Sequence, residues 1–445
     1  MSKRNGAIVL ATSAVLAAGL MVNTARAADR ATDTGSFSKQ PLYLDEPSVQ
    51  PGPAAPATPA PTTPNSESLI NDGLNKIGVG KVLTDWGLVI GGAVEGSYTY
   101  NTRAPGNNIS EGRVFDFEHD AARLNQLSLQ VGRVVDVAAA AKAGKVDIGF
   151  GVDMMYGSDA RLIHSNGLAG YNNSTHPINQ FDLTQAYLDI ILPVGTGLDI
   201  KVGKFVTLFG IETIAPVASV LNSAGGNTLY SHSYQFGFGI PFTSTGITAS
   251  YAFNDKIAVT GGITRGWEQS TNDNNSSIDL LGQVKYTPTK TWTFYFNASV
   301  GPQEARNNHD YRTLVEAIAQ YAPENSAWSF GVDGIYGYED HAALSGSTAT
   351  WYGVTGYTGY KLCDMATLNG RVEYFRDQGG SRLGVTANVY EGTLGVALKP
   401  FYKDKIGSNL VIRPEIRGDL ADKAVFDSGR HKSQATVAID AVFSL

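Results

Sequence analysis

Hydrophobic and polar residues alternate along most of the chain from Gly87 to the C-terminus. In residues 145–156, the even-numbered positions are all apolar, and positions 147 to 153 between them hold Asp or Gly. Residues 290–300 and 366–374 repeat this pattern. A repeat of two residues places side chains on the two faces of a β-strand, so these segments are predicted to be strands.

The length of the alternating segments distinguishes two kinds of β protein. A soluble sandwich also alternates, with its apolar face buried in a core. The segments here run for about ten or more residues, whereas strands in soluble proteins average about five to six. About ten residues is the length of a tilted strand that crosses a membrane. Charged residues on the polar faces also favour a barrel whose interior contains water.

The connections between segments predict the topology. They alternate between short turns, such as Asn254-Asp255, and long loops, such as 157–180 and 207–243, as in transmembrane antiparallel β-barrels. Ser233–Ile240 would break this order as a strand, so it is assigned to the second of these loops. The prediction is all-β, a barrel of about 16 strands, near 87–100, 123–136, 145–156, 181–192, 197–206, 244–254, 256–267, 277–287, 290–301, 309–322, 325–338, 347–362, 365–378, 387–400, 409–420 and 433–445.

Two strand assignments have alternatives. Residues 311–321 also fit a helix. The face of 123–136 is ambiguous because Arg133 follows the apolar phase.

The loop 207–243, after the fifth predicted strand, is long, rich in aromatic residues and Gly, and nearly free of charge. Loops longer than about 15 residues are usually functional or disordered, and this composition disfavours disorder. Its apolar surface must pack against something, so we expect the loop to fold into the barrel. Glu212 is its only acidic residue, expected near the narrowest point. Residues 212–221 could form a helical turn. A lid over the mouth and a contact with another subunit are the alternatives.

Three stretches resemble a known family. They are Gly203-Lys204-Phe205 followed by the long insert and SHSYQFGFGIPFTSTGITASYAFND (231–255), then LVIRPEIRGDL (410–420), and the C-terminal strand. Together they resemble the OmpL-like β-barrel porins of bacterial outer membranes, over most of residues 87–445. The resemblance implies a porin in the outer membrane of a Gram-negative-type bacterium, with a constriction loop after the fifth strand. A homotrimer follows only by analogy with porins.

The first 86 residues differ in composition from the rest. Lys3 and Arg4, an apolar stretch and the small-residue site Ala25-Arg26-Ala27 predict a signal peptide over residues 1–27. Residues 28–86 form a Pro-rich periplasmic linker that could act as a spacer or contact the cell wall, and apolar spacing within 66–78 predicts a short amphipathic helix. Residues 87–445 form the predicted barrel.

Composition and motifs give little support to catalysis or metal binding. The single Cys363 excludes an internal disulfide, and all seven histidines fall in long connections or at their edge, where we expect them to be solvated. Residues 272–279 offer oxygen ligands but lack the closing Glu of a calcium loop. With no nucleophile motif, the chain is not expected to be an enzyme, and no cofactor is expected.

The polar faces of the predicted strands contain the candidate functional residues. Four charges alternate in 410–420, a pattern that would be costly in a dry core and costs little beside water. We therefore predict a pore lining, with internal ion pairs in a closed barrel as the alternative. The predicted pore-lining or constriction residues are Glu212, Lys201, Arg371, Glu373, Arg413, Glu415, Arg417 and Asp419.

Together these features predict a water-filled channel for passive diffusion of small hydrophilic solutes or ions, in contact with outer-membrane lipid. A substrate-specific channel and a structural or adhesive barrel are the alternatives. The formal charge of −7 falls to −10 once Lys3, Arg4 and Arg26 leave with the signal peptide, which hints at a preference for cations. The mixed charges on the polar faces of the strands will decide the ion preference of the pore.

Overall fold

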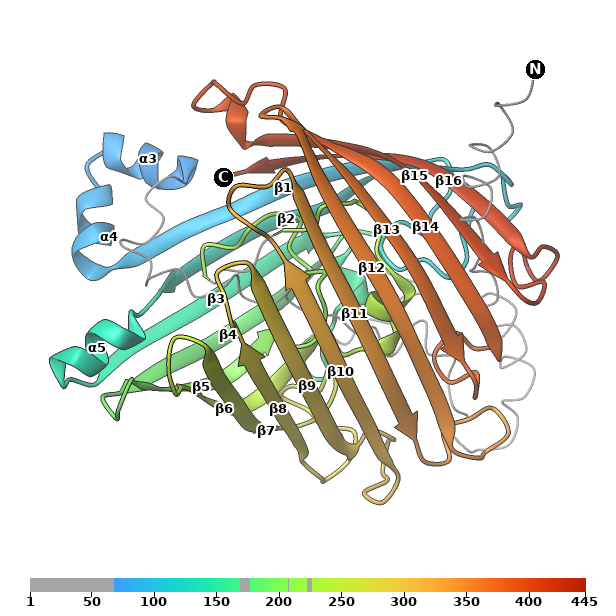
Figure 1. Ribbon diagram of the computed structural model, residues 1–445, viewed down its shortest axis with the longest axis horizontal. Coiled ribbons are helices and arrows are strands. Elements are labelled where there is room, and N and C mark those ends of the chain that lie inside the picture. The colour runs from blue at the N-terminus through green and yellow to red at the C-terminus, as the bar shows by residue number, and fades with distance from the viewer. Residues whose placement is uncertain (1–67, 169–176, 207, 222–225) are drawn as a thin grey trace.

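The computed structural model of the protein describes residues 68–168, 177–206, 208–221 and 226–445. These residues contain sixteen strands that form one closed barrel, in which β1 pairs with β16 (Figure 1). Every neighbouring pair is antiparallel, which agrees with the predicted topology. The predicted signal peptide and residues 28–67 of the predicted linker lie outside the described residues.

The observed strands follow the predicted segments closely. Residues 311–321, for which a helix was the alternative, form β10. The strands are β1 (Leu88–Asn101), β2 (Ala121–Arg133), β3 (Asp147–Gly157), β4 (Gln180–Leu192), β5 (Leu198–Val206), β6 (Thr243–Ala252), β7 (Ile257–Thr264), β8 (Asp279–Tyr286), β9 (Trp292–Pro302), β10 (Tyr311–Tyr321), β11 (Trp328–Glu339), β12 (Ala349–Cys363), β13 (Ala366–Asp377), β14 (Ala387–Leu398), β15 (Leu410–Ala421) and β16 (Ser433–Ser444).

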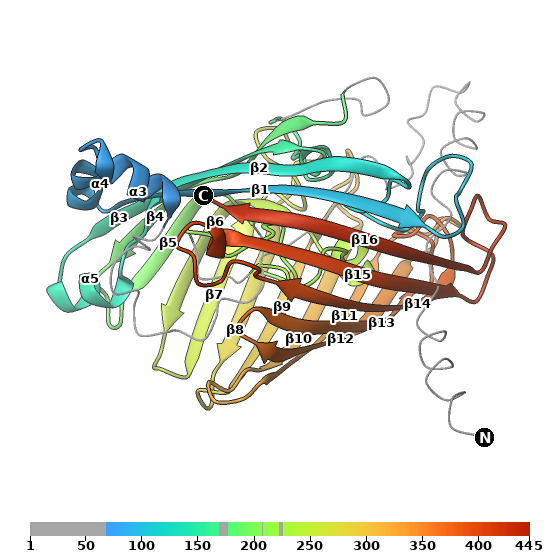
Figure 2. The same cartoon turned by 90° about the horizontal axis from the view of Figure 1, so that it is seen from above.

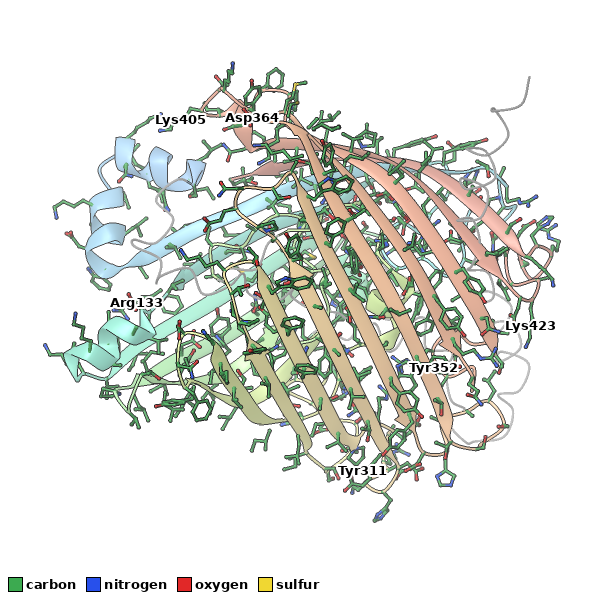
Figure 3. All side chains as sticks on the ribbon, in the orientation of Figure 1. Arg133, Tyr311, Tyr352, Asp364, Lys405 and Lys423 are labelled. Atoms are coloured by element: carbon green, nitrogen blue, oxygen red, sulfur yellow. The ribbon has the colours of Figure 1, made fainter. Side chains whose placement is uncertain are left out.

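The two ends of the barrel differ. Helices α3 (Leu69–Lys76), α4 (Gly80–Trp86) and α5 (Val137–Ala143) lie at the end that also holds the C-terminus (Figure 2). Asp364 and Lys405 lie at this same end, called the short-turn end, and Tyr311 and Lys423 lie toward the opposite end, called the long-loop end (Figure 3). Because outer-membrane barrels have short periplasmic turns and long external loops, we expect the short-turn end to be the periplasmic one, and it is called the periplasmic end below.

Strand alternation separates an apolar outer face from a polar inner face. On β15, Ile416 faces outward and is 55% exposed, whereas its neighbours Glu415 and Arg417 face inward and are buried. The ambiguous Arg133 of β2 also faces outward. It lies at the periplasmic end of β2, where its Nη1 is 2.7 Å from Oδ1 of Asp147. An arginine on the apolar face is therefore paired at the end of its strand.

Helix α3 forms where apolar spacing predicts a helix, and Ser68 caps it by accepting the N–H of Asn71. Helices α4 and α5 are not predicted from the sequence. The strand predicted to continue to 136 ends at Arg133, because the Asp136 carboxylate caps α5 and the run that follows is rich in alanine, the strongest helix former. Gly144, with φ of 62°, ends α5.

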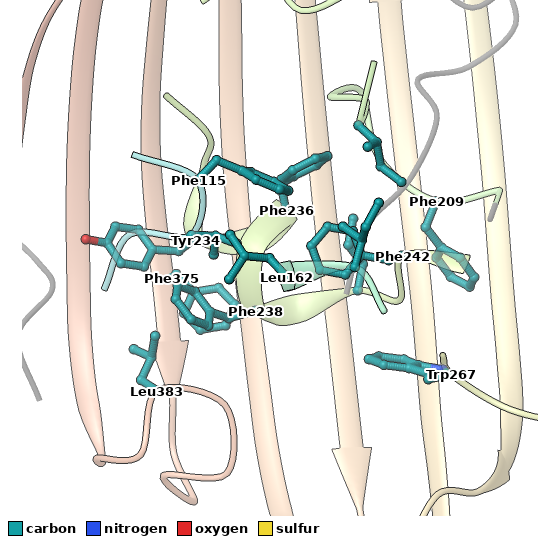
Figure 4. Packing of buried hydrophobic residues seen from close by; sticks show 14 of the residues in the cluster. Phe115, Leu162, Phe209, Tyr234, Phe236, Phe238, Phe242, Trp267, Phe375 and Leu383 are labelled. Atoms are coloured by element: carbon teal, nitrogen blue, oxygen red, sulfur yellow. The ribbon is translucent and has the colours of Figure 1, made fainter. Parts of the chain in front are cut away.

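The barrel interior contains a large aromatic cluster (Figure 4). Phe209, Phe236 and Phe242 come from the loop between β5 and β6, and the last two pack against Phe115 from the loop between β1 and β2. Trp351 of the wall is fully buried and donates its indole N–H to the carbonyl of Gly239. The interior is thus packed with loop side chains at this level.

The predicted helical turn at residues 212–221 is wrong, since the described residues there form bends. The loop instead contains the π-helical turn η2 (Gln235–Gly239). Its first turn is fixed by side chains, because Ser233 Oγ accepts the N–H of Phe236 and the Glu373 carboxylate accepts that of Gln235. Short 3₁₀ turns η1 (Ala160–Leu162) and η3 (Gly407–Asn409) complete the helical elements of the described residues.

Candidate functional site

The candidate site is the inner wall of β13 to β16 and β1, together with the long loop, defined here as residues 207–242 between β5 and β6. Six of the predicted residues lie on this wall, where strand alternation points them inward. Arg371 and Glu373 belong to β13. Arg413, Glu415, Arg417 and Asp419 belong to β15.

Arg413 joins three strands and the loop. Its Nε lies 3.0 Å from Asp440 of β16, the residue directly opposite in the strand pair. Its Nη2 lies 3.0 Å from Oε1 of Glu95 in β1. Its Nη1 donates to the backbone carbonyl of Asn227 at 2.6 Å and to that of Pro216 at 3.3 Å. One guanidinium therefore ties the closing seam of the barrel to two parts of the long loop.

Arg371 makes a second bridge to the loop. Its Nε lies 2.6 Å from the Glu391 carboxylate of β14, and its Nη1 lies 2.8 Å from Oε1 of Glu212. Nη1 also donates to the carbonyl of Ser231 at 2.5 Å. Glu212 accepts the backbone N–H of Ser233 as well, at 3.0 Å. The only acidic residue of the loop is therefore held by the wall.

Arg417 lies between these groups and the external loops. Its Nε is 2.7 Å from Oδ1 of Asp419 and 3.3 Å from Oε2 of Glu391. Its Nη1 donates to the backbone carbonyl of His232. Asp419 also pairs with Arg113 of the loop between β1 and β2. A chain of ion pairs thus runs from the seam of the barrel to two loops.

The two wall glutamates bind the loop backbone. Glu415 accepts the N–H groups of Tyr230 at 2.8 Å and Ser231 at 3.1 Å. Glu373 accepts the N–H of Tyr234 at 2.6 Å and that of the following residue at 2.6 Å. Such charge-assisted hydrogen bonds are about twice as strong as neutral ones. The wall therefore fixes consecutive residues of the loop.

The wall charges are covered. The six wall residues and Glu212 each have at most 7% of their surface exposed. The expectation that these charges stand in open water is therefore wrong, because the long loop lies over them. Internal ion pairs, the alternative reading of the alternating charges, describe their contacts. Buried charges are tolerated only when they are paired and hydrogen-bonded, which is the arrangement found here.

Lys201 lies outside this group. It belongs to β5, where its Nζ is 2.6 Å from Asp189 and 3.4 Å from the ring centre of Tyr187. Nearby, the buried Lys204 was not singled out from the sequence. Its Nζ lies 3.3 Å from Oδ2 of Asp182 in the neighbouring strand β4. The structure therefore places the cations of β5 in separate pairs.

Three partners of the network were also missed: Glu95, Glu391 and Asp440. Each occupies an inward position in an alternating strand, and Asp440 directly opposes Arg413. The alternation was a sufficient signal for their orientation. Their ion pairs depend on the register between neighbouring strands, which could not be predicted from the sequence.

Two cavities adjoin the long loop. The larger, of about 980 Å³, lies on the periplasmic side, where its lining includes Ser68, Lys399, Lys405 and Arg413. The smaller, of about 180 Å³, is lined by Glu212, Tyr357, Arg371 and Gln320 among others. Both cavities include Gly226, Asn227 and Thr228 in their linings, so this short stretch of the loop separates them.

The expectation of solvated histidines holds for some and is wrong for others. His341 has an exposed side chain. His232 instead stacks on Phe236 with ring centres 4.3 Å apart, and His119 is buried and accepts the backbone N–H of Asn101. His176 lies outside the described residues. Within residues 68–168, 177–206, 208–221 and 226–445, no group of three His, Cys, Asp or Glu residues could hold a metal ion.

Among the described residues, no helix is both long enough and apolar enough to cross a membrane. The family model "Putative beta-barrel porin-2, OmpL-like" (BBP2) matches residues 87–445, the whole of the barrel. The chain therefore belongs to this family of OmpL-like porins. No curated protein matches it.

Solved outer-membrane proteins share the fold. The outer membrane channel DcaP of Acinetobacter baumannii is similar over 80% of this chain and 97% of its own, with 12% identity and a TM-score of 0.51. OmpT of Vibrio cholerae (80% and 97% covered, 10% identity, TM-score 0.50) and an anion-selective porin from Comamonas acidovorans (80% and 99% covered, 9% identity, TM-score 0.50) are similar too. The protein is an outer-membrane porin, a channel for small solutes.

Proposed function

We propose that the channel passes small hydrophilic solutes by passive diffusion and that the long loop forms its narrowest section. One observation carries this proposal: the loop is bound to the inner wall by Arg371, Glu373, Arg413, Glu415 and Arg417, through its backbone and through Glu212. A loop held at so many points over several strands keeps its place while solutes pass. Constriction by this loop also fits the position that the sequence resemblance implies.

The two cavities indicate the path. A solute from the periplasmic side would enter the larger cavity and meet residues 226–228, beyond which the smaller cavity borders Glu212 and Arg371. We place the narrowest point at Asn227 and Thr228. Asn227 is fixed there, because its side chain bonds to Thr213 and its carbonyl accepts from Arg413.

The charges of the inner wall affect the path mainly by holding the long loop in place. Because Arg371, Arg413 and Arg417 are each paired with carboxylates, they contribute mixed rather than single-sign potential to the path. The charged side chains that line the larger cavity are Lys399, Lys405 and Arg413. We therefore propose that the periplasmic entrance favours anions, although the chain as a whole is acidic.

A planar-bilayer series with several salts and sugars tests this function. A stable conductance with a size cut-off for sugars supports diffusion. Saturation of the current by one solute would instead support a substrate-specific channel, for which the small cavity beside Glu212 and Arg371 is the candidate site. The absence of a stable conductance would support a structural or adhesive barrel.

We propose a non-enzymatic role because the family is one of porins and the interior charges are used in binding the loop. Assembly as a homotrimer is proposed from the porin resemblance alone, and light scattering of the detergent-solubilised protein tests it. The proposals of a signal peptide at 1–27 and of cell-wall contact through the Pro-rich segment concern residues outside those described.

A further inference from the structure

The external rim of the barrel has a cluster of cations on its outer surface. Among the described residues, Lys423 and Lys432 lie in the connection between β15 and β16 at the long-loop end, where Figure 3 labels Lys423. Arg376 lies at the end of β13, and Arg103 follows β1. These four residues, called the rim cations below, span five neighbouring strands, because β13, β14, β15, β16 and β1 are consecutive in the barrel.

Local hydrogen bonds position the rim cations and leave some of their N–H donors available. Lys423 Nζ donates to the carbonyl of Thr386 at 2.5 Å, and Lys432 Nζ donates to that of Asp422 at 2.6 Å. An ammonium group has three N–H donors, so these contacts leave each lysine with further donors in exposed positions. Arg103 donates from Nε to the carbonyl of Ser433 at 3.1 Å, which holds its guanidinium beside the start of β16.

A row of tyrosines lies on the same outer face, on β11 to β14, and includes the strand that holds Arg376. Tyr336, Tyr352, Tyr374 and Tyr390 occupy four adjacent strands, with successive ring centres 6.3, 6.3 and 5.2 Å apart. Such belts mark the boundary between lipid tails and headgroups in outer-membrane barrels. Arg376 is two residues beyond Tyr374, about 7 Å along the strand. Arg376 therefore lies at headgroup level, at the same end of the barrel as the other rim cations.

The net charge of this surface is positive. Its neighbouring acids are Asp422, whose Oδ2 lies 3.8 Å from Nη1 of Arg376, and Asp120, which accepts the hydroxyl of Tyr98 on β1. Burial would raise the pKa of Asp422, but hydrogen bonds from Asn388 and the charges of Lys423 and Arg376 bring it below its ordinary value. Asp422 is therefore ionised at neutral pH and balances one of the four cations. Arg430 forms its own pair with Asp427.

We propose that the rim cations bind a phosphate-bearing lipid headgroup of the outer leaflet, whose acyl chains lie along the tyrosine row. Exposed ammonium and guanidinium groups above an aromatic belt offer donors to phosphate oxygens where a lipid presents them. The site goes beyond conduction, and it lies on the outside of the wall whose inner face holds the long loop.

Native mass spectrometry of the full barrel in detergent tests this inference, with diphosphoryl lipid A as the probe. The double variant Lys423→Glu/Lys432→Glu should bind the probe at least about tenfold more weakly than the parent. The matched control Lys142→Glu/Lys145→Glu makes the same change in charge at exposed positions of the periplasmic end, and it should bind like the parent. Equal binding by the two variants would overturn the proposal.

Two further arms identify the ligand. Dephosphorylated lipid A should bind the parent no better than it binds Lys423→Glu/Lys432→Glu, and inorganic phosphate should not displace the probe. Displacement by inorganic phosphate would assign the site to the free ion and contradict a lipid site. Because the inner wall is untouched, single-channel conductance of both variants should equal that of the parent. A conductance equal to that of the parent also shows that the variant barrel has assembled. Failure of the lipid-binding proposal is therefore distinguishable from failure of the channel proposal.

Discussion

The guanidinium of Arg371 and the carboxylate of Glu212 lie 2.8 Å apart inside the barrel, and neither is exposed to bulk solvent. The two residues are 159 positions apart in the chain. Their contact fixes the long loop against β13, and the Arg371 guanidinium continues to Glu391 on β14. The shape of the interior at this level therefore depends on ion pairs between wall and loop.

Replacing Arg413 with Glu should prevent assembly rather than tune ion selectivity. The change would leave Glu95, Asp440 and the new carboxylate together in a buried site, and breaking a buried ion pair costs about 3–5 kcal/mol. Folded and unfolded barrels can be distinguished by their mobility on unheated and heated gels. Arg413→Glu/Asp440→Arg restores opposite charges in the same strand pair and should recover part of the folded fraction. Full assembly of Arg413→Glu alone would contradict the burial described here.

Loosening one anchor of the loop should make the channel current noisier. Glu415→Gln keeps an acceptor oxygen but removes the charge that binds the N–H groups of Tyr230 and Ser231. We expect a loss of about 1–2 kcal/mol of loop stabilisation and more frequent transitions between conductance levels in single-channel recordings. Asp364→Asn removes a carboxylate in an exposed periplasmic turn and serves as the control. Identical noise in both variants would show that Glu415 does not hold the loop.

The entrance charges should govern selectivity. Lys399 and Lys405 line the larger cavity, so Lys399→Glu/Lys405→Glu should shift the reversal potential in a salt gradient toward cation preference. High salt should reduce the shift, because screening shortens the range of exposed charges. Lys142→Glu/Lys145→Glu alters the net charge equally in the connection between β2 and β3 and should leave the reversal potential unchanged. Equal shifts in both variants would point to net charge instead of the entrance.

The orientation of the barrel can be tested with its single thiol. Cys363 is exposed at the end of β12, in a short turn, so a membrane-impermeant maleimide should not label it in intact cells. Ser345→Cys in a Cys363→Ser background places the thiol in the connection between β11 and β12, at the opposite end of the barrel, and it should be labelled. Both sites should react once the cells are opened. Labelling of Cys363 alone in intact cells would invert the orientation.

Much of the fold follows from the sequence because the alternation is strict where one face meets lipid. The outward Ile412, Pro414 and Ile416 set the phase of β15, and the inward charges follow from it. Helix α5 was missed because a short alanine-rich run between strands has no amphipathic pattern, and its caps are local contacts of Asp136 and Gly144.

The interior was harder to predict for a different reason. The inward direction of Arg413 and Arg417 follows from their spacing, but their burial depends on a loop about 200 residues away in the chain. Likewise, the aromatic residues of that loop indicate that it packs on something without indicating what. Phe115 and Trp351 meet them only because the barrel closes.

A bulky side chain at the boundary of the two cavities should narrow the path. Thr228 is exposed there and lines both cavities, so Thr228→Trp should lower the single-channel conductance, by roughly half or more if the path is of molecular width. Ser345→Trp, at an exposed position of the long-loop end, provides the control and should conduct like the parent. Unchanged conductance in Thr228→Trp would place the path elsewhere.

The role of the long loop is tested most directly by the single-channel conductance of a variant that lacks residues 215–226. This deletion removes Pro216, whose carbonyl accepts from Arg413, and with it residues 216–218 of the lining of the larger cavity. Asn227 and Thr228 remain but lose the chain segment that positions them, while Glu212 and the anchors at Tyr230 and Tyr234 are kept. If the loop sets the narrowest section, the variant should conduct more than the parent and admit larger sugars. A variant that assembles normally and conducts like the parent, with the same sugar cut-off, would contradict the account.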